Sequence, residues 1–178
     1  MLFRSDPERY ARDYWSRVPD SYASGDACRF DADGYAWFAG RADEVIKIAA
    51  HRIGTVEVET AFLHHPAVAE AGVTGAPDEV RGEIIAAFVV LKPGLEPTPE
   101  LERELRATVR EVLGPVAVIG DIHIVSSLPK TRSGKIMRRV LKAVVTGVDV
   151  GDVSTIENEG SVEDARAAAD ELRRETGA

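Results

Sequence analysis

The chain has 178 residues, with 22 lysines and arginines against 30 aspartates and glutamates, a formal net charge of −8 and one cysteine, Cys28. This length suits one compact domain with additional segments; the acidic balance argues against a nucleic-acid binder, and a single cysteine excludes an internal disulfide or a cysteine metal cluster. No apolar run approaches the ~20 residues of a membrane span, and residues 1–15 lack the apolar stretch of a secretion signal, so we expect a cytoplasmic protein without membrane contact.

The first part of the chain resembles the edge of a larger unit. Residues 1–30 are polar, contain several tyrosines and tryptophans, and show no sustained hydrophobic period. Asp33-Gly34 is a turn signal before a short aromatic run, which predicts a hairpin. The β-branched apolar residues 44–50 then predict a strand.

The pattern changes to a helical one at residue 55. Residues 55–65 predict a helix that Thr55 can cap and that ends at His65-Pro66, with Val58 and Phe62 facing inward. Further elements are expected along the chain, as strands at 67–75, 83–91 and 122–125 and as helices at 100–113 and 136–145. The strand at 83–91 is almost wholly apolar and is therefore expected at the centre of the sheet.

One stripe supports the helix at 100–113. Its apolar residues recur at spacings of four, four and three, and they are Leu101, Leu105, Val109 and Val112. After Gly147 the composition becomes acidic, and only residues 161–175 regain a helical pattern, without a convincing apolar stripe.

These elements predict an α+β fold: a small mixed β-sheet flanked by helices, with an N-terminal hairpin segment and a peripheral C-terminal tail. We expect three parts, at residues 1–42, 43–148 and 149–178.

The strongest local anomaly is the basic segment 129–142. It contains six positive charges and no acid in an otherwise acidic chain, at Lys130, Arg132, Lys135, Arg138, Arg139 and Lys142. Gly134 gives the backbone freedom just before Lys135, an arrangement that can bring a compact charge to a phosphate. A Walker-type phosphate loop fails, because Pro129 stands where it needs glycine and Ile136 where it needs serine or threonine. A solvated basic helix face explains the charges, but it does not explain the pattern of turn-forming residues in Pro-Lys-Thr-x-Ser-Gly-Lys.

A second segment surrounds the predicted strand at 44–50. Arg41 and Arg52 bracket this strand, and guanidinium groups suit the bidentate capture of phosphate. Asp43 follows the first arginine and, taken alone, is a turn residue. His51 and the pair at 64–65 have no neighbours in the sequence that would complete a metal site.

Seven ordered segments of the sequence resemble one family. They are SGD (24–26), DGYAWFAGR (33–41), RADEVIK (41–47), HRIGTVEVE (51–59), HPAVAEAGV (65–73), GEIIAAFVVL (82–91) and LPKTRSGKIMRR (128–139). Together they resemble the C-terminal part of AMP-forming acyl-CoA synthetases, in the adenylate-forming superfamily. The similarity is greatest to acetyl-CoA synthetases, which GDVSTIE (151–157) also fits.

The resemblance implies a division of labour. A large N-terminal AMP-binding domain would hold the acyl pocket and most of the ATP site, and residues 1–42 would be the end of that domain. Residues 43–148 would form a C-terminal lid that turns about a hinge at Asp43. Lys135 matches the lysine that enters the site for adenylation, Asp26 the aspartate that holds the ATP ribose, and Arg41 an arginine that contacts nucleotide.

The same resemblance implies the remaining partners. Arg52 matches an arginine near the phosphates, and Arg110 falls where acetyl-CoA synthetases place an arginine near CoA. The family uses ATP, Mg²⁺, CoA and, in its short-chain members, a short carboxylic acid. In relatives the lysine matched by Lys135 is a target of acetylation, which implies an acetyltransferase and a deacetylase as further partners.

Two departures from the family pattern stand out. The family usually has glycine before the His-Arg pair, where CoA passes close to the backbone, and this chain has Ala50. The phosphate loop and acyl-pocket domain have no counterpart in the sequence, so we expect the chain by itself to be inactive. The alternatives left open are a non-catalytic module that binds CoA, nucleotide or a protein, and the lid of a peptide-synthetase adenylation domain.

Overall fold

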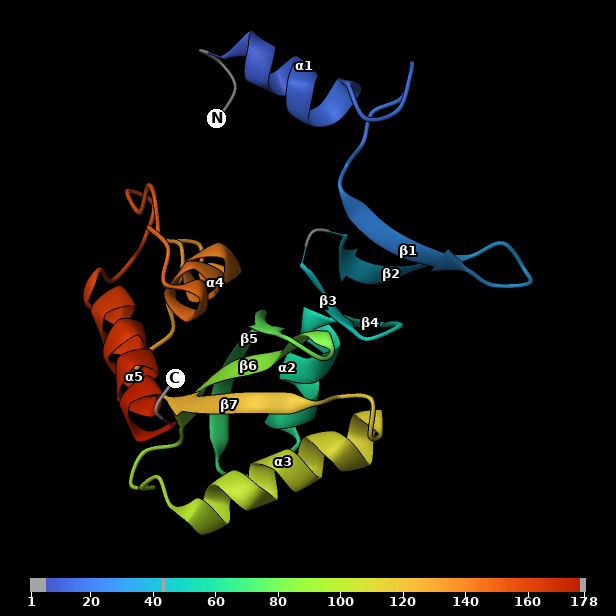
Figure 1. Cartoon of the computed structure of the whole chain (residues 1–178). Helices are drawn as coiled ribbons and strands as arrows, with labels where there is room; N and C mark the ends of the chain where they lie inside the picture. Colours follow the sequence, from blue (N-terminus) through green and yellow to red (C-terminus); the bar gives the residue numbers. More distant parts are fainter. Residues whose placement is uncertain (1–5, 43, 177–178) are drawn as a thin grey trace. The chain divides into compact units, whose positions relative to one another are not determined.

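The computed structural model describes residues 6–42 and 44–176, and the chain divides into two units, Met1–Asp43 and Glu44–Ala178 (Figure 1). Each unit is described by itself. The predicted hinge residue Asp43 lies outside the described residues. Within them, no helix is long and apolar enough to cross a bilayer.

The first unit contains a helix, α1 (Pro7–Trp15), and a hairpin of β1 (Asp26–Phe30) and β2 (Ala36–Arg41). The sequence did not predict α1, which begins because the Asp6 side chain accepts a hydrogen bond from the Arg9 amide at 2.9 Å. The predicted hairpin is confirmed. The carboxylate of Asp31 accepts hydrogen bonds from Trp37 and from the Tyr35 amide, which lower the pKa of Asp31.

Several aromatic side chains lie at the surface of this unit. Tyr14 stacks on Tyr22 with ring centroids 5.0 Å apart, and Trp15 meets Tyr22 edge-on. Trp37 and Phe38 of the hairpin are exposed, and α1 buries none of its side chains. The described part of this unit therefore has exposed apolar surface, and its helix α1 does not form a hydrophobic core.

The second unit has a mixed sheet. Its elements are β3 (Val45–Ile48), β4 (His51–Gly54), α2 (Thr55–Leu63), β5 (Val68–Asp78), β6 (Gly82–Leu91), α3 (Pro99–Leu113), β7 (Ile119–Ile124), α4 (Arg138–Thr146) and α5 (Gly160–Thr176). Strand β6 pairs antiparallel with β5 along its length, antiparallel with β3 at one residue pair, and parallel with β7. The predicted central place of β6 and the α+β class are confirmed.

Helices cover both faces of this sheet. Alternate residues of β6, among them Ile85 and Val89, join the cluster that α2 and α3 complete, whereas Phe88 joins a cluster with Leu141 of α4 and Ala165 of α5. Figure 1 accordingly shows α3 on one side of β7 and α4 and α5 on the other. This alternation follows from the two-residue period of a strand.

The predicted helix faces hold with two corrections. Val58 of α2 is fully buried, as predicted, but Gly54 rather than Thr55 occupies the cap position. In α3 the residues Leu105 and Val109 are fully buried, whereas Val112, the last member of the predicted stripe, is 45% exposed. In the last turn of α3 it is Leu113, four residues after Val109, that packs against the core cluster in place of Val112.

The C-terminal segment differs from the expected peripheral tail. Helix α5 packs on the sheet through Ala165 and Ala169, which are 0% and 3% exposed, beside Phe88 and Leu141. Alanine adds little to a hydrophobic stripe, but its small side chain lets the helix backbone approach closely. The sequence pattern therefore identified the helix and did not reveal its buried face.

This packing predicts that an acid at position 165 is not tolerated. We expect Ala165→Asp to lower the free energy of unfolding by about 3–5 kcal/mol, because the carboxylate would be buried without a partner. Ala167→Asp, on the exposed side of the same helix, controls for helix propensity and should cost less than about 1 kcal/mol. Urea unfolding of the two variants measures the difference, and equal costs would show that α5 does not pack as described.

Candidate functional site

The predicted adenylation lysine lies at the end of a tight turn. Lys130 and Ile136 form an antiparallel bridge, and between them the Thr131 amide donates to the Lys135 carbonyl at 2.9 Å. The Lys135 amide donates in turn to the hydroxyl of Thr131 at 3.2 Å. Gly134, at φ +80°, supplies the left-handed conformation that closes the turn. The local sequence thus holds the backbone of Lys135 and leaves its side chain exposed.

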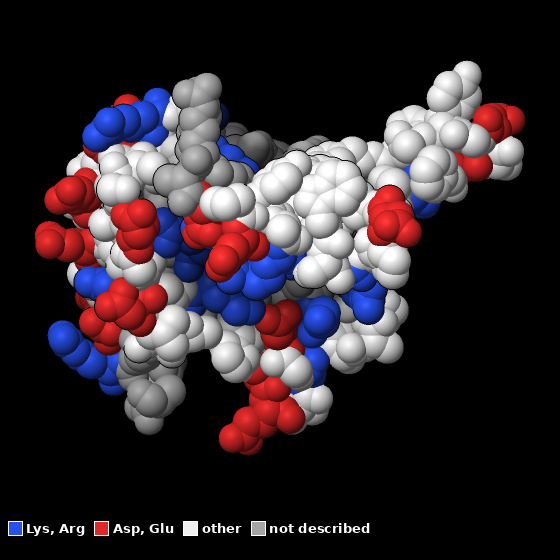
Figure 2. Space-filling model, turned by 90° about the horizontal axis from the view of Figure 1, so that it is seen from above, with Lys and Arg blue, Asp and Glu red and all other residues white. Residues whose placement is uncertain are grey.

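The six positive charges of the basic segment divide into two groups. Four contact the chain itself: Lys130 pairs with Glu70 at 2.6 Å, Lys142 pairs with Glu83 at 2.6 Å, and Arg138 and Arg139 are described below. Among the described residues no acid pairs with Arg132 or Lys135, and both are exposed. On the face shown in Figure 2 basic and acidic side chains lie next to one another. The segment is therefore not simply a solvated basic helix face, and its cations are not all available to bind phosphate.

Arg138 is the most enclosed member of the segment. Its guanidinium donates two hydrogen bonds to Glu59 of α2, at 2.7 and 2.6 Å, and one to Glu44 at 2.8 Å. Glu59 is only 7% exposed and also accepts a hydrogen bond from the Val73 amide of β5. The hydrogen bonds that Arg138 donates to Glu59 raise the pKa of Arg138 against the effect of burial, and the charges of Glu59 and Glu44 raise it further. This network joins α4, α2 and the residue that follows Asp43.

Two other cations of the segment also fix its position. Lys142 bonds to Glu83, whose other oxygen accepts from the Lys47 amide at 2.9 Å. Burial by itself would raise the pKa of Glu83, but these bonds and the two lysine charges lower it overall. Arg139 donates to the carbonyls of Val150 and Asp152. The helix that follows Lys135 is therefore tied to both the sheet and the next loop.

The structure brings together two of the predicted nucleotide ligands. In the first unit a guanidinium nitrogen of Arg41 lies 3.3 Å from the Asp26 carboxylate, across the paired ends of β1 and β2, and 2.7 Å from the Ser24 carbonyl. Because the two units are described separately, this pair is not placed relative to Lys135.

The other predicted residues lie on the second unit. Ala50 and Arg52 occupy the β3–β4 hairpin, and both are exposed. Arg110 is exposed near the end of α3. Since α3 covers one face of the sheet and α4 follows the Lys135 turn on the other, Arg110 and Lys135 belong to opposite layers. The structure therefore does not gather Lys135 and Arg110 into one site.

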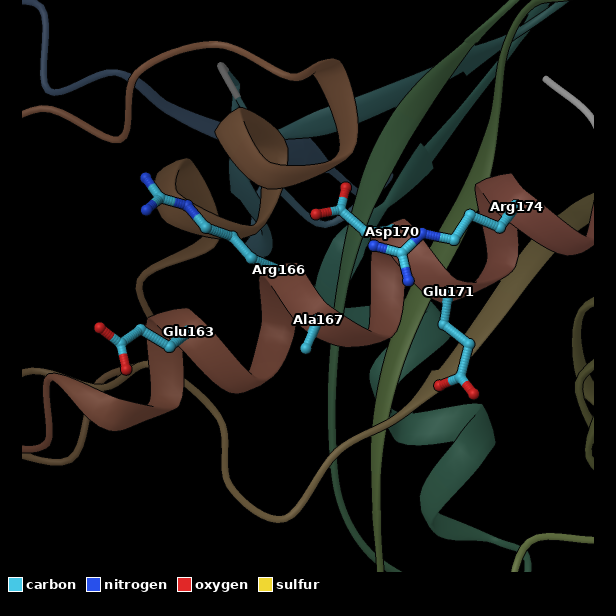
Figure 3. Close-up of a pocket in the computed structure, with 6 residues that line it drawn as sticks. All are labelled: Glu163, Arg166, Ala167, Asp170, Glu171 and Arg174. Atoms are coloured by element: carbon cyan, nitrogen blue, oxygen red, sulfur yellow. The ribbon is translucent and has the colours of Figure 1, made fainter.

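The depression on α5 and the histidines at 51 and 65 do not supply an alternative centre. A depression of about 520 Å³ is lined by residues of α5 alone, and their side chains project in different directions from the helix (Figure 3). It is therefore the solvent face of a helix and not a cleft. His51 is exposed, and His65 lies 3.4 Å from Glu104. Within residues 6–42 and 44–176, no group of His, Cys, Asp and Glu is arranged to hold a metal ion.

Sequence reasoning missed both carboxylates that hold Arg138. Glu59 carried a readable signal, because it lies three positions before the inward-facing Phe62 and therefore on the same side of the helix. A carboxylate on an apolar helix face needs a cation. Glu44 carried no such signal, because a residue at the start of a strand can point either way.

Comparison with known proteins identifies the class. Residues 57–135 match the family model of the AMP-binding enzyme C-terminal domain. The chain therefore contains an AMP-binding enzyme C-terminal domain, and the resemblance inferred from the sequence is confirmed.

Within this class the chain corresponds to the C-terminal part of acetyl-CoA synthetases. It is 58% identical over 170 residues to an acetyl-coenzyme A synthetase of Pyrobaculum arsenaticum, covering 96% of this chain and 25% of the relative. It is 51% identical over 174 residues to a 3-hydroxypropionyl-coenzyme A synthetase of Metallosphaera sedula, covering 98% of this chain and 26% of the relative. The chain thus spans about a quarter of the length of these relatives.

A solved structure shows the same fold. The acetoacetyl-CoA synthetase of Streptomyces lividans matches 94% of this chain and 25% of its own with a TM-score of 0.80, at 23% sequence identity. This likeness concerns the fold alone.

The contribution of the Arg138 network to the free energy of unfolding can be tested. We expect Arg138→Met to lower the free energy of unfolding by about 3–5 kcal/mol, because it leaves the buried Glu59 carboxylate without its partner. Arg138→Met combined with Glu59→Gln should recover part of that loss, which a double-mutant cycle by urea unfolding measures.

Arg103→Met provides the control, since Arg103 and its partner Glu100 are 72% and 68% exposed. Its loss should stay below about 1 kcal/mol. A cost for Arg138→Met no larger than this would contradict the role given to the network.

Proposed function

We propose that this chain acts as the lid portion of an AMP-forming acyl-CoA ligase, together with a large AMP-binding domain. The overall reaction converts a short-chain carboxylic acid, ATP and CoA into acyl-CoA, AMP and pyrophosphate. The observation that carries the proposal is Lys135: its backbone is held in a tight turn, and its ammonium is exposed while four neighbouring cations bond within the chain. The names of the relatives support the same reaction class.

The adenylation step explains the need for this cation. A carboxylate oxygen attacks the α-phosphorus of ATP, a bond to that phosphorus forms, and pyrophosphate leaves. Both reactants are anions, and negative charge builds on the phosphoryl oxygens. An ammonium held at this position would stabilise that charge without forming a covalent bond. Asp26 and Arg41 are proposed to bind the ribose and nucleotide, and Arg52 to lie near the phosphates.

The second step requires a different surface. The CoA thiol attacks the acyl carbon of the acyl-adenylate and AMP leaves, so the Lys135 charge is no longer needed. Rotation about Asp43 would withdraw Lys135 and present the hairpin with Ala50, and Arg110 would approach CoA. The location of Lys135 and Arg110 in opposite layers of the second unit supports such an exchange.

The proposed function also involves Mg²⁺ and acetylation of Lys135. Mg²⁺ would arrive with the nucleotide and balance the pyrophosphate charge, and the described residues provide no cluster to hold it. Acetylation of the exposed Lys135 would remove its charge and prevent adenylation, so an acetyltransferase and a deacetylase are proposed partners. A cytoplasmic location, where ATP and CoA are available, belongs to the same proposal.

A second candidate function is a non-catalytic binding module. The exposed aromatic side chains of the first unit, among them Trp37 and Phe38, favour contact with another protein. Such a module would bind a partner without supporting turnover, so the experiment below separates the two.

The role of Lys135 can be tested by complementation. The 178-residue chain is combined with the Pyrobaculum arsenaticum relative truncated before its matching quarter, and acetate-dependent ATP–pyrophosphate exchange and CoA-dependent AMP release are measured. We expect Lys135→Ala to lower the exchange rate by about 10²–10³-fold, because one preorganised charge partner is lost.

Lys92→Ala is the matched control, an exposed lysine in the loop after β6, and should leave both rates unchanged. Equal activity of Lys135→Ala and the unmodified chain would refute the proposed role. Absence of any complementation, with binding of CoA or nucleotide by calorimetry, would support the module.

The alanine before the His-Arg pair gives a further prediction. In the complemented enzyme, Ala50→Gly should speed thioester formation from acyl-adenylate and CoA by up to about tenfold, since removing one methyl group widens a tight passage. Adenylation should stay unchanged. Rapid-quench measurement of the two half-reactions provides the comparison.

Ala49→Gly is the control on the same turn. Ala49 has a φ of +51°, so glycine there should stabilise the hairpin by about 1 kcal/mol and leave thioester formation unaffected. If both glycines speed the step equally, the cause is turn flexibility and not the width of the passage.

A further inference from the structure

Within the segment 149–158, residues 155–157 lie directly against the turn that carries Lys135. Thr131 and Ile156 form an antiparallel bridge. The Arg132 amide donates to the Thr155 carbonyl at 3.2 Å, and the Glu157 amide donates to the Lys130 carbonyl at 2.9 Å. This segment therefore pairs with the first arm of the turn through one bridge and two flanking backbone hydrogen bonds.

The segment is itself firmly held. The side chain of Ile156 is 5% exposed and packs with Met137, Val140 and Val162, which come from the start of α4 and from α5. Arg139 bonds to two carbonyls near the beginning of the segment, and α5 follows its end. Its position is thus fixed relative to the helices on that face of the sheet.

The turn needs such support. A two-stranded hairpin is marginally stable by itself in water, and the arms of this turn are joined by one bridge pair. Electrostatic stabilisation of a transition state requires a charge held in place before the reaction, and a misplacement of about 1 Å can cost about 10²-fold in rate. The match to the family model covers residues 57–135 and therefore stops before residues 149–158.

We propose that residues 149–158 are a positioning element for the adenylation lysine, with Ile156 as its main anchor. The element holds the backbone of residues 130–135 so that the Lys135 ammonium is presented in one arrangement. The effect on adenylation rests on the proposed function. The effect on the backbone of residues 130–135 does not depend on that function.

The structural consequence is measured on the 178-residue chain by amide hydrogen exchange. We expect Ile156→Ala to raise the exchange rates of the Thr131, Gly134 and Lys135 amides by at least about tenfold relative to amides of β6, because the turn opens locally. Ile122→Ala removes an equally buried isoleucine, also 5% exposed, from β7. It should not raise exchange in the turn more than in β6.

Two milder variants protect the test from loss of folding. Ile156→Val should give a smaller increase of the same kind, and Ile156→Leu, which restores the apolar volume, should return exchange toward that of the unmodified chain. Unchanged exchange at 131–135 in both Ile156→Ala and Ile156→Val would overturn the proposal. So would an increase in Ile156→Ala that β6 shares equally.

The catalytic consequence is measured in the complemented enzyme. We expect Ile156→Ala to lower kcat for acetate-dependent ATP–pyrophosphate exchange by about 10–10²-fold, with KM for ATP little changed and the rate of thioester formation from preformed acyl-adenylate retained. Equal loss in both half-reactions would mean a general structural role and would overturn the positioning role. If the unmodified chain fails to complement, the proposed function fails, and the exchange experiment still decides whether residues 149–158 hold the turn.

Discussion

The structure of the second unit depends on one largely enclosed cation, the guanidinium of Arg138, whose side chain is 13% exposed. It satisfies the carboxylates of Glu59 and Glu44 and thereby joins helix α4, helix α2 and the residue that follows Asp43. Because Arg138 is three residues beyond Lys135, these contacts also hold the chain just after the lysine turn. A buried carboxylate without its partner is costly, so this arrangement is strongly specified once the chain is folded.

The cations of the basic segment around Lys135 have two different roles: most of them hold the segment in place, and Lys135 remains exposed. Most of the segment's cations contact carboxylates or carbonyls of the chain, as Lys142 does with Glu83, and these contacts hold the segment on the sheet. Lys135 lies on the turn, where its backbone amide and carbonyl are hydrogen-bonded to Thr131 and its side chain is exposed. A charge that is placed accurately and remains available is what the proposed adenylation chemistry requires.

The C-terminal segment changes the picture of the domain. The match to the family model ends at Lys135, yet the following residues return to that turn through Ile156 and then cover the sheet with α5. A domain defined by residues 57–135 alone would lack α4, the Arg138 contacts and the bridge between Thr131 and Ile156. The surroundings of the lysine are therefore completed by residues distant from it in the sequence.

The sequence by itself determined the α+β class, the central strand at 83–91, most of the buried faces of α2 and α3 and the resemblance that leads to Lys135, because hydrophobic period and local motifs depend on residues that are close together in the chain. It did not determine the partners of Arg138, the buried face of α5 or the pairing of residues 155–157 with the lysine turn. Alanines give a weak stripe, and a carboxylate meets a cation 79 positions away only after the sheet has brought their helices together. Tertiary structure decided these features, since each depends on surfaces that exist only in the folded chain.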